Sequence, residues 1–152
     1  MRSGTTLAAN GIRVAVRRGW EAEFRVLDRR PGEPELSVVH LANFGLPPER
    51  GDYGSGAVET MDSGGILVIL TEFGAGSRDA ALFSGGGVPA GLDVGDFSPD
   101  SLQHRFPGRA GVQQFFRVAE RAFGLHVVLG SARAAPLLVP EVNRTLAGIS
   151  IG

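Results

Sequence analysis

Apolar and polar residues alternate with a period of two along several segments of this chain. In residues 12–18, for example, Ile12, Val14 and Val16 are separated by charged or small residues. Because successive side chains of a β-strand point to opposite faces of the sheet, this alternation predicts a strand with one buried face. The same reasoning predicts further strands over residues 21–29, 36–42, 66–73, 111–118 and 121–130.

Short connections between these segments favour an antiparallel arrangement. A turn separates residues 12–18 from residues 21–29, so these two segments are predicted to form a hairpin. Residues 111–118 and 121–130 are predicted to form a second hairpin for the same reason. Residues 66–73 are mostly apolar and are expected to lie at the centre of the sheet.

One segment near the end of the chain repeats with the period of a helix instead. Leu138, Val142 and Leu146 recur at every fourth position, which predicts a helix over residues 136–147. Residues 149–151 alternate once more as a short strand. The expected fold class is therefore α+β: mainly an antiparallel sheet of about five to seven strands, packed on one face by the C-terminal helix.

The middle of the chain, residues 43–100, is rich in glycine and proline and is predicted to consist largely of long irregular loops. The length of 152 residues is that of one domain, residues 1–152. The chain contains no cysteine and no lysine. This composition excludes disulfides, thiolate zinc sites and cysteine nucleophiles, and also the lysine chemistry of P-loops and Schiff bases.

The net charge of −1 and the lack of any basic run longer than two residues argue against nucleic acid binding. The first residues lack the apolar region of a secretory signal, and no apolar segment is long enough to predict a membrane span. A cytoplasmic location is therefore expected if Met1 is the native start.

Charge is distributed unevenly along the chain. Residues 1–48 carry seven arginines and five acidic residues. Residues 49–100 carry two arginines and nine acidic residues, and residues 101–152 carry six arginines and two acidic residues. This division fits either ordinary internal ion pairing or a bipolar surface that steers a partner or a second copy of the chain.

Three parts of the sequence, in order, carry a resemblance to a known fold. They are an opening strand that ends at Gly19-Trp20, a hairpin that ends with His126 to Gly130, and a closing helix-then-strand from Val142 to Ile151. Together they resemble the PsbP/Mog-like α+β fold. The resemblance implies a non-enzymatic binding or assembly factor with an accessory role, and it supplies no catalytic motif.

Residues that could perform chemistry are few. The three histidines, His40, His104 and His126, do not have the spacing of a metal site, so no metal and no other cofactor is predicted. Residues 148–152 match G-x-S-x-G by letter, but a nucleophile elbow needs a helix after the serine. No catalytic residue is assigned.

Two surfaces are candidates for binding. The first is a glycine-rich segment in which Asp52, Tyr53, Ser55 and Glu59 form either a ligand-facing loop or a tight turn with a purely structural role.

The second lies on the 111–130 hairpin, where apolar residues occur on both faces. Either the glycine-rich middle or a second subunit must cover the face that the helix leaves open. Phe115 and Phe116 with Arg117 and Arg121 have the composition of an interface. The sequence thus favours a non-catalytic protein-binding or assembly module that self-associates. The alternative is a small-molecule-binding domain, or an unrecognised hydrolase, that uses the acidic loops in residues 43–100.

Overall fold

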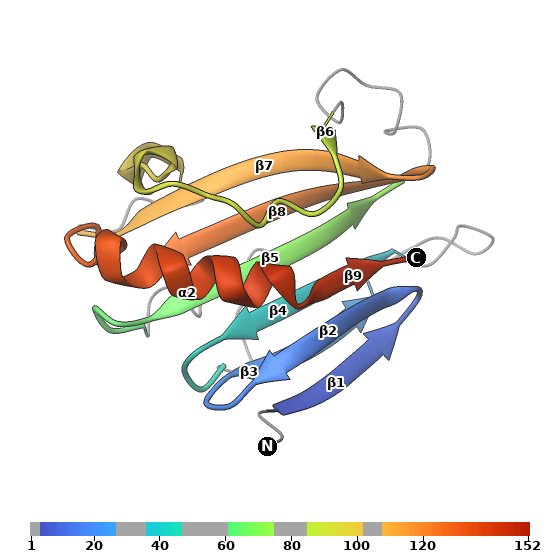
Figure 1. Cartoon of the computed structure of the whole chain (residues 1–152), viewed down its shortest axis with the longest axis horizontal. Coiled ribbons are helices and arrows are strands. Elements are labelled where there is room, and N and C mark those ends of the chain that lie inside the picture. The colour runs from blue at the N-terminus through green and yellow to red at the C-terminus, as the bar shows by residue number, and fades with distance from the viewer. Residues whose placement is uncertain (1–3, 27–35, 47–60, 75–84, 102–107) are drawn as a thin grey trace.

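The computed structural model describes residues 4–26, 36–46, 61–74, 85–101 and 108–152 (Figure 1). The strands are β1 (Gly4–Ala9), β2 (Ile12–Arg17), β3 (Glu21–Val26), β4 (Ser37–Ala42), β5 (Ile66–Phe73), β6 (Gly85–Gly86), β7 (Ala110–Val118), β8 (Arg121–Leu129) and β9 (Ile149–Ile151). The helix α2 spans Ala135–Ala147, and two short 3-10 helices, η3 (Val94–Asp96) and η4 (Pro99–Ser101), precede β7.

The strands form two sheets rather than one. A six-stranded sheet has the order β3-β4-β5-β8-β7-β6, and a three-stranded sheet has the order β1-β2-β9. All neighbouring strands pair antiparallel except β6, which pairs parallel with β7. The prediction of a mainly antiparallel β-structure with a C-terminal helix packed on it is confirmed, and the central place of β5 is confirmed as well.

The predicted hairpin between residues 12–18 and 21–29 is wrong. The strand β2 pairs with β1 and β9, whereas β3 pairs with β4 in the other sheet. Between them the chain turns at Gly19, which has a φ of +85°, and the Trp20 N–H donates to the Arg17 carbonyl at 3.0 Å. This turn takes the chain from the three-stranded sheet to the six-stranded sheet. The alternation of apolar and polar side chains is the same in both sheets, so it does not show which strand pairs with β2.

The partner of β2 in the hairpin is β1, joined by the two residues Asn10 and Gly11. Both have positive φ angles, 51° and 78°. A two-residue turn with this backbone matches the twist of paired strands, and Asn-Gly is the sequence that adopts it most readily. The hairpin is therefore encoded locally, although the alternation of β1 itself is weak.

One core joins the two sheets and the helix. In Figure 1 the helix α2 crosses in front of the six-stranded sheet and continues into β9. Val139, Val142 and Leu146 of the helix pack into the same cluster as Ile12 and Val14 of β2. The helix ends at Gly148, whose N–H donates to the Thr145 carbonyl at 3.0 Å. No helix of the described segments has the length and apolar character needed to cross a membrane.

The opposite face of the six-stranded sheet is also buried. Its fully buried residues come from three adjacent strands and are almost all apolar: Val38, His40, Ala42, Leu67, Ile69 and Val128. Among the described residues this face is therefore buried along β4, β5 and β8, whereas on β7 the same face carries the exposed Gln113 and Arg117.

Candidate interaction surface

The three-stranded sheet exposes its outer face. Every second residue of its strands lies on this face, and five of these residues are exposed to solvent: Thr6, Ala8, Arg13, Ala15 and Ser150. We refer to these five residues as the open sheet face. Four of them have small side chains, so the surface around the arginine is nearly flat backbone.

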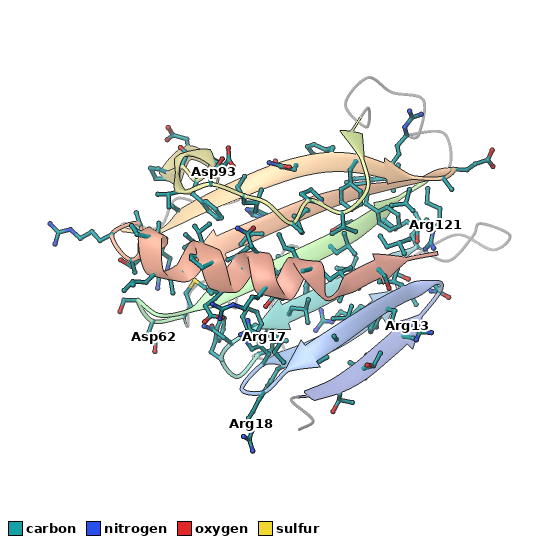
Figure 2. The ribbon with its side chains drawn as sticks, viewed as in Figure 1. Arg13, Arg17, Arg18, Asp62, Asp93 and Arg121 are labelled. Carbon is teal, nitrogen blue, oxygen red and sulfur yellow. The ribbon has the colours of Figure 1, made fainter. Side chains whose placement is uncertain are left out.

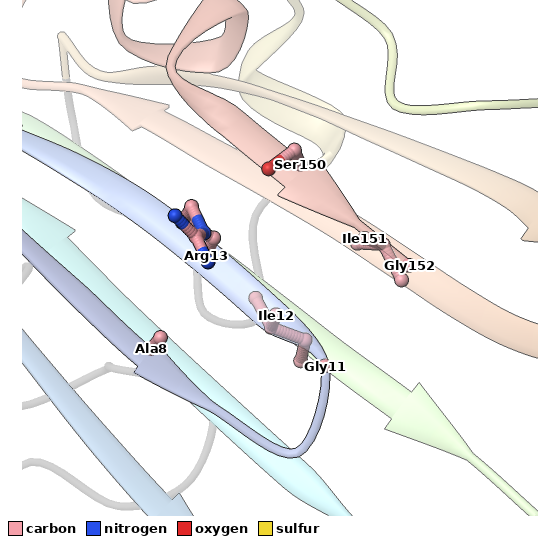
Figure 3. Close-up of a pocket in the computed structure, with 7 residues that line it drawn as sticks. All are labelled: Ala8, Gly11, Ile12, Arg13, Ser150, Ile151 and Gly152. Atoms are coloured by element: carbon pink, nitrogen blue, oxygen red, sulfur yellow. The ribbon is translucent and has the colours of Figure 1, made fainter.

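Arg13 occupies the middle of the open sheet face. It pairs with Ala8 on one side and with Ser150 on the other, and Figure 3 shows it between the two strands that carry them. Within the described part of the chain, no hydrogen bond or ion pair involves its guanidinium. The surrounding hollow, of about 290 Å³, is lined by Ala8, Gly11, Ile12, Arg13, Ser150, Ile151 and Gly152. A planar cation with unused donors thus lies in a shallow depression, where a carboxylate could accept two hydrogen bonds from it.

Arg17, on the same strand, is fixed in place. Its Nη2 atom lies 2.8 Å from Oε2 of Glu141 on α2, and its Nη1 atom is 3.4 Å from both the Glu141 carbonyl and the Thr145 hydroxyl. Arg144 contacts the other oxygen of the same carboxylate at 2.9 Å. The hydrogen bond from Arg17 lowers the pKa of Glu141 below its ordinary value, and the Arg144 charge acts in the same direction. This network joins the helix to the small sheet.

A second hollow lies on the other side of β9, at the end of α2. It has a volume of about 340 Å³, and none of the described residues that line it is charged. Its lining residues are Gly87, Val88, Ala90, Val118, Leu146, Ala147, Ile149, Ser150 and Ile151. Both hollows therefore border β9, and among their described lining residues only Arg13, in the first hollow, is charged.

The ligand-facing loop predicted from the sequence falls outside the described residues. This applies to Asp52, Tyr53, Ser55 and Glu59, and to His104. The small-molecule or hydrolase alternative depends on them and stays a prediction.

The two phenylalanines of the predicted interface lie on opposite faces of β7, as expected for adjacent strand residues. Phe116 is 1% exposed and stacks on Phe123 with ring centroids 5.4 Å apart. Phe116 was predicted to lie at an interface, but its side chain belongs to the core shared with α2 and the small sheet. Phe115 is half-buried on the other face, with its ring centroid 6.1 Å from that of Phe73.

The two arginines of that prediction also differ from each other. Arg117 is exposed. Arg121 forms two hydrogen bonds of 2.9 Å to the Glu72 carboxylate, and this contact holds the pKa of Arg121 above its ordinary value. Arg121 therefore has a structural partner within the chain.

The two described histidines belong to the buried face of the large sheet. His40 is opposite Ile69, which is opposite His126, so one apolar residue lies between them. Among the described residues, no group of three or more His, Cys, Asp or Glu side chains is arranged to hold a metal ion.

The open sheet face was missed by sequence reasoning because β1 was not predicted. Thr5, Thr6, Ala8 and Ala9 do not alternate clearly in polarity. The turn Asn10-Gly11 was the available signal, since it predicts a strand on each side of it.

Comparisons of the chain with family models, with curated proteins and with solved structures found no match. The function is therefore inferred from the surface of the molecule itself.

Proposed function

We propose that this chain is a non-catalytic protein-binding or assembly module whose binding surface is the open sheet face. The observation that carries the proposal is the exposed guanidinium of Arg13, which has no hydrogen-bond or ion-pair partner among the described residues and lies on a face made of small side chains. Arginine is enriched at protein interfaces, and small neighbours allow the backbone of a partner to approach closely. A partner that presents a carboxylate to Arg13 fits this surface.

The polar groups elsewhere support contact rather than catalysis. Glu72 and Glu141 are held by arginines, in pairs that join elements of the fold. Ser150, the serine of the G-x-S-x-G match, lies within the strand β9, whereas a nucleophile elbow places the serine on a sharp turn. The sequence resemblance to the PsbP/Mog-like fold, which stays a prediction, implies a non-enzymatic role and agrees with this proposal.

The test is site-specific photocrosslinking in the cells that naturally produce this chain. A photoreactive residue at Ser150, on the open sheet face, is expected to give a protein adduct that depends on Arg13 and is lost with Arg13→Glu. The matched control is a photoreactive residue at Leu137, which is 79% exposed on α2. No adduct from position 150, or equal adducts from both positions, would overturn the proposed surface. Stoichiometric labelling of Ser150 by a fluorophosphonate would overturn the non-catalytic part.

A further inference from the structure

The edges of the two sheets are not equally protected. Edge strands of natural proteins are normally short, charged or interrupted, because their free backbone groups can pair with another chain. The edge strand β3 carries Glu21, Glu23 and Arg25, while β6 and β9 have two and three residues. By contrast β1, with the sequence GTTLAA, has six residues and neither charge nor proline.

The backbone of β1 presents hydrogen-bonding groups to solvent. In a hairpin with a two-residue turn, the residues that flank the turn form a hydrogen-bonded pair, here Ala9 and Ile12. Since such pairs alternate along an antiparallel ladder, the N–H and C=O groups of Thr6 and Ala8 point away from β2. Among the described strands β1 is the edge of its sheet, and no other described strand lies on its outer side in Figure 1.

We propose that β1 pairs antiparallel with β1 of a second copy of this chain, about a two-fold axis that passes between the two Thr6 residues. This register uses the outward-pointing backbone groups, and it sets Gly4 opposite Ala8 of the second copy. The proposed pairing rests on the proposed function, because it names a second copy of the chain as a partner for the same three-stranded sheet. The product is one continuous six-stranded sheet, β9-β2-β1 followed by the same three strands of the second copy in reverse order.

The side chains fit this pairing. The two threonines on the axis can form a cross-strand pair, which is a favourable combination in antiparallel sheets. No like charges are directly opposite each other, because β1 is uncharged and Arg13 and Arg17 lie one strand further in. The pairing also joins the open sheet faces of the two copies into one larger surface.

The dimer should be weak and should depend on concentration. A single pair of six-residue strands buries far less than the roughly 1,200 Å² of a standard stable interface. We therefore expect a monomer at low micromolar concentration and a growing dimer fraction toward millimolar concentration.

Sedimentation velocity across that range tests the proposal. Thr6→Lys puts two like charges opposite each other on the axis and is expected to shift the equilibrium to monomer. Leu137→Lys is the matched control, because it adds the same charge at a position on α2 that is 79% exposed, and it should leave the dimer intact. Thermal melting of both variants verifies that they are folded.

Disulfide trapping tests the register, and the chain suits this method because it contains no cysteine. The Cα atoms of a directly opposite hydrogen-bonded pair are about 5.5 Å apart, within the range of a disulfide. Thr6→Cys should therefore give a covalent dimer under mild oxidation, and Ser150→Cys should not. A strictly monomeric mass throughout would overturn the proposal, and so would a dimer that resists Thr6→Lys and is not trapped by Thr6→Cys. If either of these results is obtained, a photocrosslinked adduct between position 150 and a different protein would still support the proposed function.

Discussion

The guanidinium of Arg121 holds the carboxylate of Glu72 through two hydrogen bonds of 2.9 Å, from Nε to Oε2 and from Nη2 to Oε1. The two residues lie on the neighbouring strands β8 and β5. The Glu72 side chain is 10% exposed and that of Arg121 is 28% exposed. The guanidinium carbon also lies 5.2 Å from the centroid of the Phe123 ring. Arg121, which the sequence placed at an interface, thus pairs with Glu72 and packs on the core residue Phe123 instead.

The Arg121–Glu72 pair should show strong coupling in a double-mutant cycle. Arg121→Met leaves the Glu72 carboxylate nearly buried without its cation, and we expect a loss of about 2–3 kcal/mol in the free energy of unfolding. The value lies below the largest ones for buried pairs because Arg121 is partly open to water. Glu72→Leu combined with Arg121→Met should recover most of the loss. Urea denaturation measures all the variants, and additive losses would contradict the coupling.

The contact between Gly130 and Asp62 allows no side chain at position 130. A Cβ atom on Gly130 would collide with the backbone carbonyl of Asp62, in the turn before β5. The same turn is closed by the Gly65 N–H to Asp62 carbonyl bond of 3.0 Å, so it cannot move freely. Gly130→Ala is expected to cost about 3 kcal/mol or more, at the upper end of overpacking effects.

Gly91→Ala is the matched control for this substitution, because nothing lies within 4 Å of its Cβ position. It should leave the free energy of unfolding nearly unchanged. Equal stabilities of the two alanine variants in urea denaturation would show that the turn at Asp62 adjusts.

The elements that the sequence predicted best are those whose pattern depends on burial alone. The strand β5 has the predicted bounds, and α2 differs from the predicted helix by one residue, since its apolar face packs on the sheet. The pairing of β2 was not predictable from alternation, because the pattern states which side chains are buried and not which strand lies alongside. The turn at Gly19 decides that question, and glycine is compatible with a hairpin turn and with a change of layer.

The candidate surface was harder to predict for a related reason. An exposed arginine among small residues has no distinctive pattern, and Arg13 and Arg17 look equivalent in the sequence. The position of α2 separates them, because Glu141 reaches Arg17, whereas Arg13 has no partner in the described segments. In the same way, Phe116 and Arg121 acquire their structural roles from distant segments of the chain.

The seam between α2 and the sheets should not tolerate a charge. Leu146 is 1% exposed and belongs to the core that joins the helix to both sheets. Leu146→Asp buries an unpaired carboxylate and removes apolar contacts, so we expect the protein to lose its cooperative melting transition. Leu137→Asp on the same helix is the matched control, since Leu137 is 79% exposed. A folded, equally stable Leu146→Asp variant would contradict the packing of the helix.

The network of Arg17, Glu141 and Arg144 predicts a stability contribution that depends on pH. Because the hydrogen bond from Arg17 lowers the pKa of Glu141 in the folded state, protons bind more readily to the unfolded chain. The contribution is therefore fully present above the ordinary carboxyl pKa, and it is lost as the pH falls through the lowered pKa of the folded state. It should be small, because Glu141 and Arg17 side chains are 40% and 31% exposed and water screens their charges.

Arg17→Gln should reveal this contribution, with Arg18→Gln as the control. Arg18 is exposed, extends away from the turn after β2 in Figure 2, and forms no hydrogen bond or ion pair with the described residues. In an NMR titration the pKa of Glu141 should rise toward its ordinary value in Arg17→Gln and stay the same in Arg18→Gln. The difference in the free energy of unfolding between Arg17→Gln and the parent chain should be larger at neutral pH than in acid. In acid the Glu141 carboxyl is protonated, and Arg17 keeps only its hydrogen bonds to the Glu141 carbonyl and the Thr145 hydroxyl. A Glu141 pKa that does not respond to Arg17→Gln would mean that Arg144 alone sets the charge of this carboxylate.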